Sequence, residues 1–227
     1  MRVFLIPVGH SGYEPYCEVD DDDRIEQPRG GWLSGLVSRF REVVAAAERH
    51  RRRGAHDDDP HAPTVVGRLR TRVMRWIAER IAEQRLLWHL RGEHSVTLVH
   101  PADLGSDRAL QALRSSLQRD ADRHRRWLAI DTVALVLSAV LAIVPGPNLI
   151  AYFFAFRVVG HFLSWRGASH GLARVDWTSE ANAALADLRH VAALDPPDRQ
   201  TRVRDIAAAL ELPHLPSFFE RVAPKSA

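Results

Sequence analysis

The stretch Thr-Val-Ala-Leu-Val-Leu-Ser-Ala-Val-Leu-Ala-Ile-Val-Pro-Gly-Pro-Asn-Leu-Ile-Ala-Tyr-Phe-Phe-Ala-Phe, residues 132–156, contains no charged side chain. It is longer than the roughly 20 apolar residues with which a helix crosses a bilayer. Pro145 and Pro147 lie in its middle, however, and two prolines this close together end a helix. Three interpretations are therefore open: a single membrane span, a membrane hairpin, or a helical hairpin buried in the core of a soluble protein.

The residues that flank this stretch favour a hairpin. Trp127 and Trp165 both lie about 26 Å along a helix from the central turn, and Arg126 and Arg166 accompany them. Tryptophan and arginine at one level are typical of a membrane–water interface, and basic residues on both flanks favour a cytoplasmic position for both ends. We therefore predict a hairpin with these four residues as interface anchors. Its turn consists of Pro145, Gly146, Pro147 and Asn148.

Arg157 is the residue that fits a membrane arm least well. It lies about 13 Å from the turn, near the middle of the bilayer, where an arginine costs roughly 2.5 to 3.5 kcal/mol. It must therefore reach the interface, pair with an acid or a lipid phosphate, or line a wet cavity. A hairpin inside a soluble bundle accommodates this charge more easily.

Asp131 and His161 are the other candidate site residues. In the hairpin they stand about 21 and 20 Å from the turn, so their side chains can face each other. An ionisable pair at this depth indicates a functional site, and aspartate with histidine is suited to relaying protons. The alternative is a structural pair that fastens the two arms together. Asp131, His161 and Arg157 are thus the candidates for an ion or proton relay.

The sequence around the turn is similar to that of a known family. Residues 144–149 read Val-Pro-Gly-Pro-Asn-Leu, and residues 151–157 read Ala-Tyr-Phe-Phe-Ala-Phe-Arg. Together they resemble the proteins grouped as mitochondrial potassium–proton exchange-related, which also occur in bacteria. The resemblance covers residues 133–172.

Within that resemblance Arg157, His161 and Gly167 fall in register with the family pattern, whereas Gly160 and Ser164 replace a serine and an alanine. The resemblance implies an association with cation–proton exchange across an inner or plasma membrane. It leaves open whether the protein transports ions or regulates a transporter.

Composition narrows the remaining classes. The 227 residues carry a net charge of only +3, which gives too weak a field for a nucleic-acid-binding protein. Lys225 is the single lysine, and the wealth of arginine and alanine suggests a GC-rich bacterial genome. Cys17 is the single cysteine, which fits a reducing compartment. No pattern typical of a nucleophile with a base, a phosphate loop or a zinc site is present, so we expect no enzyme, no cofactor and no metal.

The rest of the chain predicts mainly helices. Residues 3–8 and 95–100 are short apolar runs that can pair as two strands, and amphipathic helices surround them. The predicted fold class is mainly α with a small two-stranded β element, a helical bundle with a central hydrophobic helical hairpin. The predicted regions are 1–127, an amino-terminal α/β region with a flexible connector at 54–63; 128–172, the hydrophobic hairpin; and 173–227, a carboxy-terminal helical segment.

These observations favour a membrane-associated accessory or regulatory component of monovalent cation (potassium)–proton exchange. The alternatives are a membrane-anchored helical scaffold that binds another protein and a soluble helical domain with a buried hairpin. The expected partners are the lipid bilayer and either a cation transporter or a second copy of the chain. The expected location is a bacterial inner (plasma) membrane, with the soluble parts on the cytoplasmic side.

Overall fold

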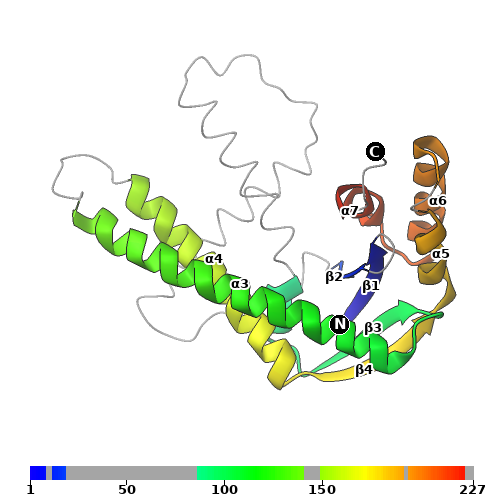
Figure 1. Cartoon of the computed structure of the whole chain (residues 1–227), viewed down its shortest axis with the longest axis horizontal. Coiled ribbons are helices and arrows are strands. Elements are labelled where there is room, and N and C mark those ends of the chain that lie inside the picture. The colour runs from blue at the N-terminus through cyan, green and yellow to red at the C-terminus, as the bar shows by residue number, and fades with distance from the viewer. Residues whose placement is uncertain (9–11, 19–85, 141–148, 192–193, 223–227) are drawn as a thin grey trace, which may run out of the picture.

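The computed structural model combines an α/β layer structure with a long helical hairpin (Figure 1). The predicted turn at 145–148 and the predicted connector at 54–63 lie outside the residues that the structure describes. Those residues are 1–8, 12–18, 86–140, 149–191 and 194–222.

A four-stranded mixed sheet forms the middle layer. Its order is β2-β1-β3-β4; β1 is antiparallel to β2 and parallel to β3, and β3 is parallel to β4. The predicted pairing of residues 3–8 with 95–100 is present as the β1–β3 pair. The strands are β1 (Arg2–Val8), β2 (Gly12–Tyr16), β3 (Ser95–Pro101) and β4 (Asp176–Asn182).

The prediction of a two-stranded element was therefore wrong, because the sheet also contains β2 and β4, and β4 lies in the part of the chain that was predicted to be helical. Both missed strands lie at the edges of the sheet, where polar, exposed side chains are expected. β4 reads Asp-Trp-Thr-Ser-Glu-Ala-Asn and is mostly exposed, so it lacks the apolar alternation that reveals a half-buried strand. β2 is only five residues long and contains Pro15.

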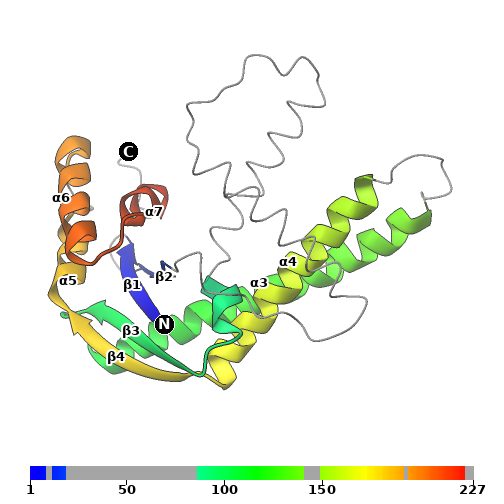
Figure 2. The ribbon, with the colours of Figure 1, turned by 180° about the vertical axis from the view of Figure 1, so that it is seen from behind.

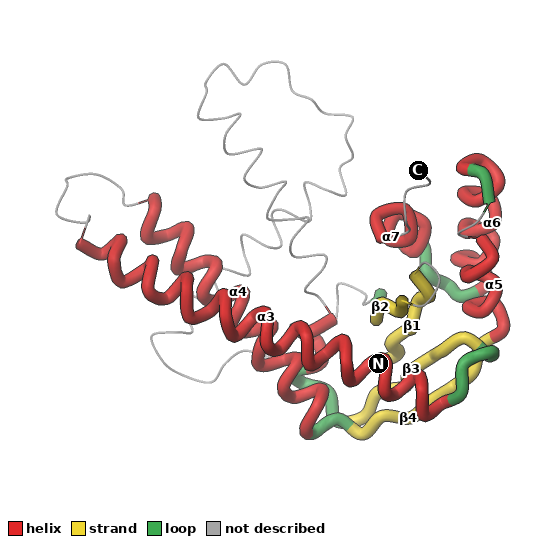
Figure 3. The backbone as a smooth tube through the Cα atoms, in the orientation of Figure 1, coloured by secondary structure: helices red, strands yellow, loops and turns green. Residues whose placement is uncertain are grey.

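Helices cover both faces of the sheet, as Figures 2 and 3 show. Alternate side chains of a strand point to opposite faces. Val3 and Leu5 accordingly belong to one core cluster, with α3, α4 and a helical segment at 86–90, whereas Phe4 and Ile6 belong to a second cluster with α5, α6 and α7. The helices are α3 (Ser106–Val140), α4 (Leu149–Ala173), α5 (Ala183–Val191), α6 (Pro196–Ala209) and α7 (Leu215–Val222).

The hairpin is not the centre of a bundle, and this part of the predicted fold was also wrong. The first half of α3 packs on the sheet, and the second half of α4 packs on α3 and on the 86–90 segment within the same core cluster, through residues such as Leu113 and Ala168. Beyond the sheet the two helices continue side by side away from the α/β layers (Figure 1). α3 also runs unbroken across the predicted boundary between residues 127 and 128.

A close helix contact fixes α4 on the 86–90 segment. A Cβ atom at Gly167 would lie 1.7 Å from the Leu87 carbonyl oxygen, so only glycine fits there. One turn away, the Trp88 indole Nε1 donates a hydrogen bond of 2.9 Å to the buried Ser164 hydroxyl. The sheet-side half of the hairpin is thus anchored at defined positions.

Two acidic side chains lie together where α3 passes β2. Burial raises the pKa of Asp120 from 3.8 to about 6, and the Glu14 charge adds to this shift, while Arg123 and Arg119 oppose it. Burial also raises the pKa of Glu14. The folded state therefore binds a proton at Asp120 more tightly than the unfolded state does. Protonated Asp120 therefore favours the folded state. This stabilisation is fully present below about pH 4 and is lost as the pH rises through about 6.

We expect Asp120→Asn to stabilise the protein at pH 7.5 and to leave it nearly unchanged at pH 4. The amide removes the cost of a half-buried charge, which after allowance for solvent screening is about 1 to 2 kcal/mol, or roughly 3 to 6 °C in Tm. Thermal unfolding at the two pH values measures the effect. Asp122→Asn is the control, because the Asp122 side chain is 43% exposed and pairs with Arg125. Equal gains at both pH values would contradict the prediction.

Candidate functional site

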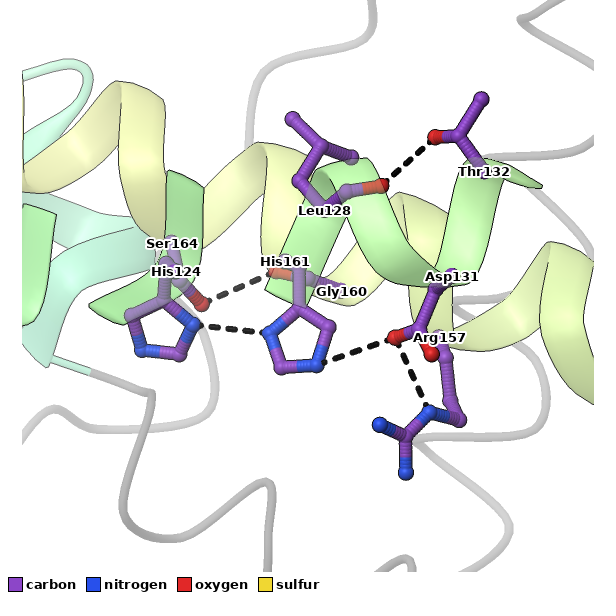
Figure 4. Close-up of polar contacts among 8 residues, drawn as sticks. All are labelled: His124, Leu128, Asp131, Thr132, Arg157, Gly160, His161 and Ser164. Atoms are coloured by element: carbon purple, nitrogen blue, oxygen red, sulfur yellow. Dashed lines mark hydrogen bonds and ion pairs between the residues drawn. The ribbon is translucent and has the colours of Figure 1, made fainter. Parts of the chain in front are cut away.

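A buried carboxylate lies between α3 and α4 where they extend beyond the sheet (Figure 4). Asp131 comes from α3, and Arg157 and His161 come from successive turns of α4. Residues four apart on a helix share a face, so both α4 side chains point towards α3. The structure thus brings together the three residues that the sequence analysis singled out.

The Asp131 carboxylate receives two contacts on one oxygen. Arg157 Nε donates a hydrogen bond of 3.0 Å to Asp131 Oδ2, and His161 Nε2 lies 3.3 Å from the same oxygen. The side chain of Asp131 is 3% exposed, whereas that of Arg157 is 23% exposed. A carboxylate this buried needs a cationic or hydrogen-bonding partner, and here it has both.

His124 extends this cluster and was not predicted from the sequence. Its Nδ1 lies 2.8 Å from His161 Nδ1, and the residue is buried. His124 precedes Asp131 by two helical turns, so the two occupy one face of α3. That seven-residue spacing was the signal in the sequence. The spacing identifies His124 as a site residue only when it is known that this face of α3 lies against the face of α4 that carries Arg157 and His161.

Aromatic side chains cover the cluster. The Trp127 ring stacks on the His161 ring, with centroids 6.4 Å apart and 18° between the planes. The Arg157 Cζ atom lies 5.5 Å from the centroid of Trp127 and 5.7 Å from that of Phe153. Trp127 is itself 43% exposed, so its ring lies between part of the cluster and the surroundings.

The four predicted interface anchors occupy different environments. Trp127 lies over the cluster, while Trp165 is half-buried and packs against the sheet-side core. Arg126 and Arg166 are exposed. Their role at a membrane surface stays a prediction.

Chemically, the cluster is a line of groups that can exchange protons. Two imidazoles and a carboxylate lie within hydrogen-bond reach in the order His124, His161, Asp131. The same contacts also fasten α3 to α4, so a structural role is equally built into the geometry. In the described residues no group of three or more side chains is arranged to hold a metal ion.

The far part of the hairpin exposes apolar side chains. On α3, Ile130, Val133, Val136 and Leu137 are each more than half exposed, and Phe153 and Phe162 are exposed on α4. Exposed apolar groups that gather on one element indicate an interaction surface. Within the part of the chain that the structure describes, no helix has both the length and the apolar character needed to cross a membrane.

Fold and site together define an α/β domain that carries a helical hairpin with a buried ionisable cluster. Residues 41–173 match the family described as mitochondrial K+-H+ exchange-related, which is more than half of the chain. The chain therefore belongs to this family, and the resemblance seen in the sequence is confirmed. All four residues of the cluster lie within the matched region. No curated protein and no solved structure matches the chain.

Proposed function

We propose that this chain is a membrane-associated accessory or regulatory component of potassium–proton exchange, at a bacterial inner (plasma) membrane with its α/β layers on the cytoplasmic side. The observation that carries the proposal is the buried Asp131 between His161 and Arg157, on the hairpin of a chain from an exchange-related family. Ionisable side chains that are sequestered between two helices, in contact with one another, suit a group that takes up and releases protons.

The apolar surface of the hairpin supports the association with a bilayer. The exposed side chains of Ile130, Val133 and Leu137 repeat at helical spacing along α3. Arg125 and Arg126 precede them on the same helix, and both are exposed. An apolar helix surface that begins beside basic residues suits entry into a membrane from its anionic side.

A role beside a transporter is favoured over a pore. Two helices cannot enclose a pathway for a cation, so transport would need a second copy of the chain or a separate cation transporter. In the accessory role, the protonation state of the cluster sets how α3 and α4 pack, and the bound transporter senses that packing.

The test is potassium-dependent proton flux in everted membrane vesicles from bacteria that express the full chain. Wild-type vesicles are expected to show more flux than vesicles with an empty vector. Asp131→Asn is expected to return the flux to the vector level, because an amide cannot accept the proton. Asp122 is a half-exposed acid on the same helix, so Asp122→Asn is the matched control and is expected to keep wild-type flux.

Washing the same membranes with alkaline carbonate tests the location. Wild type and Asp131→Asn are both expected to remain in the pellet, which shows that a loss of flux does not come from a loss of insertion. Release of the wild type by carbonate would favour the soluble helical domain. If wild type, Asp131→Asn and Asp122→Asn all remain in the pellet but give flux at the vector level, a membrane-anchored scaffold that binds another protein is favoured.

A further inference from the structure

The contact between His124 and His161 fixes where their protons lie. An ionised Asp131 can only accept, so His161 must carry its proton on Nε2 to satisfy the 3.3 Å contact. In a neutral imidazole the other nitrogen is then an acceptor. The 2.8 Å between the two Nδ1 atoms is a hydrogen-bond distance, and it needs one proton between them. His124 therefore donates from Nδ1 to His161 Nδ1.

This arrangement can take up one proton, but not two, without a change in geometry. When one ring becomes an imidazolium, the contact between the Nδ1 atoms stays a hydrogen bond and becomes charge-assisted, which strengthens it. When both rings are charged, an N–H group faces another N–H group at 2.8 Å, and the two cations repel each other. The second proton must therefore separate the rings.

We propose that His124 and His161 together form a binding site for a single proton. In the exchange function proposed above this site loads the relay, and that role rests on the proposed function. Asp131 from α3 is the counter-ion of the site, and Arg157 from α4 competes for the same carboxylate oxygen. The Trp127 ring lies nearly parallel to the His161 ring, with the centroids 6.4 Å apart, so it covers one side of the site.

The relay step is balanced in protons and needs no other reactant. As His124 gains a proton, its Nδ1–H bond breaks and a new N–H bond forms at His161 Nδ1. The His161 Nε2–H bond then breaks, and the proton passes to Asp131 Oδ2. The heavy atoms are already at contact distance for both transfers.

The site can be observed directly by NMR of the full chain with 15N-labelled histidine in detergent micelles. We expect a scalar coupling across the N–H···N bond between the two Nδ1 nuclei, and we expect both rings to respond to the uptake of one proton. His124→Gln and His161→Gln should each abolish the coupling. His190→Gln, on the exposed side of α5, should retain it and serves as the control. Resolved signals of both rings without the coupling, and with independent titrations, would overturn the proposal.

Measurements of potassium-dependent proton flux distinguish the shared-proton site from the proposed role in exchange. His124→Gln is expected to lower potassium-dependent proton flux to the vector level, as Asp131→Asn does. If the coupling is present but both variants keep wild-type flux, the pair binds a proton as a structural contact and the exchange role fails. If the coupling is absent while Asp131→Asn still loses flux, the shared-proton site fails and the exchange role stands.

Discussion

Gly167→Ala is expected to destabilise the protein by about 3 kcal/mol or more, or roughly 10 °C in Tm. The added Cβ would lie 1.7 Å from the carbonyl oxygen of Leu87 and 2.6 Å from its carbonyl carbon. Both are backbone atoms of a buried residue, so no side-chain rotation relieves the overlap. α4 would have to move away from the 86–90 segment, which breaks the hydrogen bond between Trp88 and Ser164. The helix propensity gained by alanine, about 1 kcal/mol, offsets only part of this loss.

Alanine substitutions at Gly167 and at two further glycines are expected to destabilise the protein to decreasing extents. A Cβ at Gly171 would lie 3.2 Å from a methyl group of Leu90 and 3.3 Å from one of Leu117, and these side chains can yield. At Gly92 the nearest atom would be 4.0 Å away. Thermal unfolding of the three alanine variants should therefore rank Gly167→Ala far below Gly171→Ala, with Gly92→Ala close to wild type. A Gly167→Ala protein that melts within about 2 °C of wild type would show that α4 does not approach this closely.

The neighbourhood of Asp131 and His161 could be predicted from the sequence because a helix rises by a constant amount per residue. Equal distances from one turn place two residues at one height on adjacent antiparallel arms. The structure has the two side chains in contact at 3.3 Å, with Arg157 on the same oxygen. Spacing carries no information on function, so the relay stays a proposal.

Other parts of the fold could not be predicted because they depend on tertiary contacts. β4 is a strand because its backbone pairs with β3 along its whole length, and its own side chains are mostly exposed. His124 joins the site only through the rotation of α3 against α4. Trp165 and Trp127 lie at equal distances from the turn along the sequence, yet Trp165 packs on the core because α4 lies against the 86–90 segment at that point.

Arg157→Leu is expected to cost about 3 to 5 kcal/mol, the usual loss when one partner of a buried ion pair is removed. The two residues of this pair differ in their exposure to solvent. Asp131 is 3% exposed and cannot reach water, whereas Arg157 is 23% exposed and can turn its guanidinium outward. Removal of the arginine therefore strands a buried carboxylate, while Asp131→Asn leaves a cation that can be solvated. We expect Asp131→Asn alone to cost clearly less.

The double variant isolates the stranded charge in this pair. Asp131→Asn combined with Arg157→Leu has no buried charge, so it should recover most of the stability that Arg157→Leu loses in denaturant unfolding of the full chain. The loss in Arg157→Leu should also shrink at acidic pH, because a protonated His161, 3.3 Å from the carboxylate, can take over the role of the guanidinium. If Arg157→Leu were at least as stable as wild type, the ion pair would contribute nothing to folding. The retention of an arginine between two helices would then need a functional reason, because an apolar side chain would pack there at lower cost.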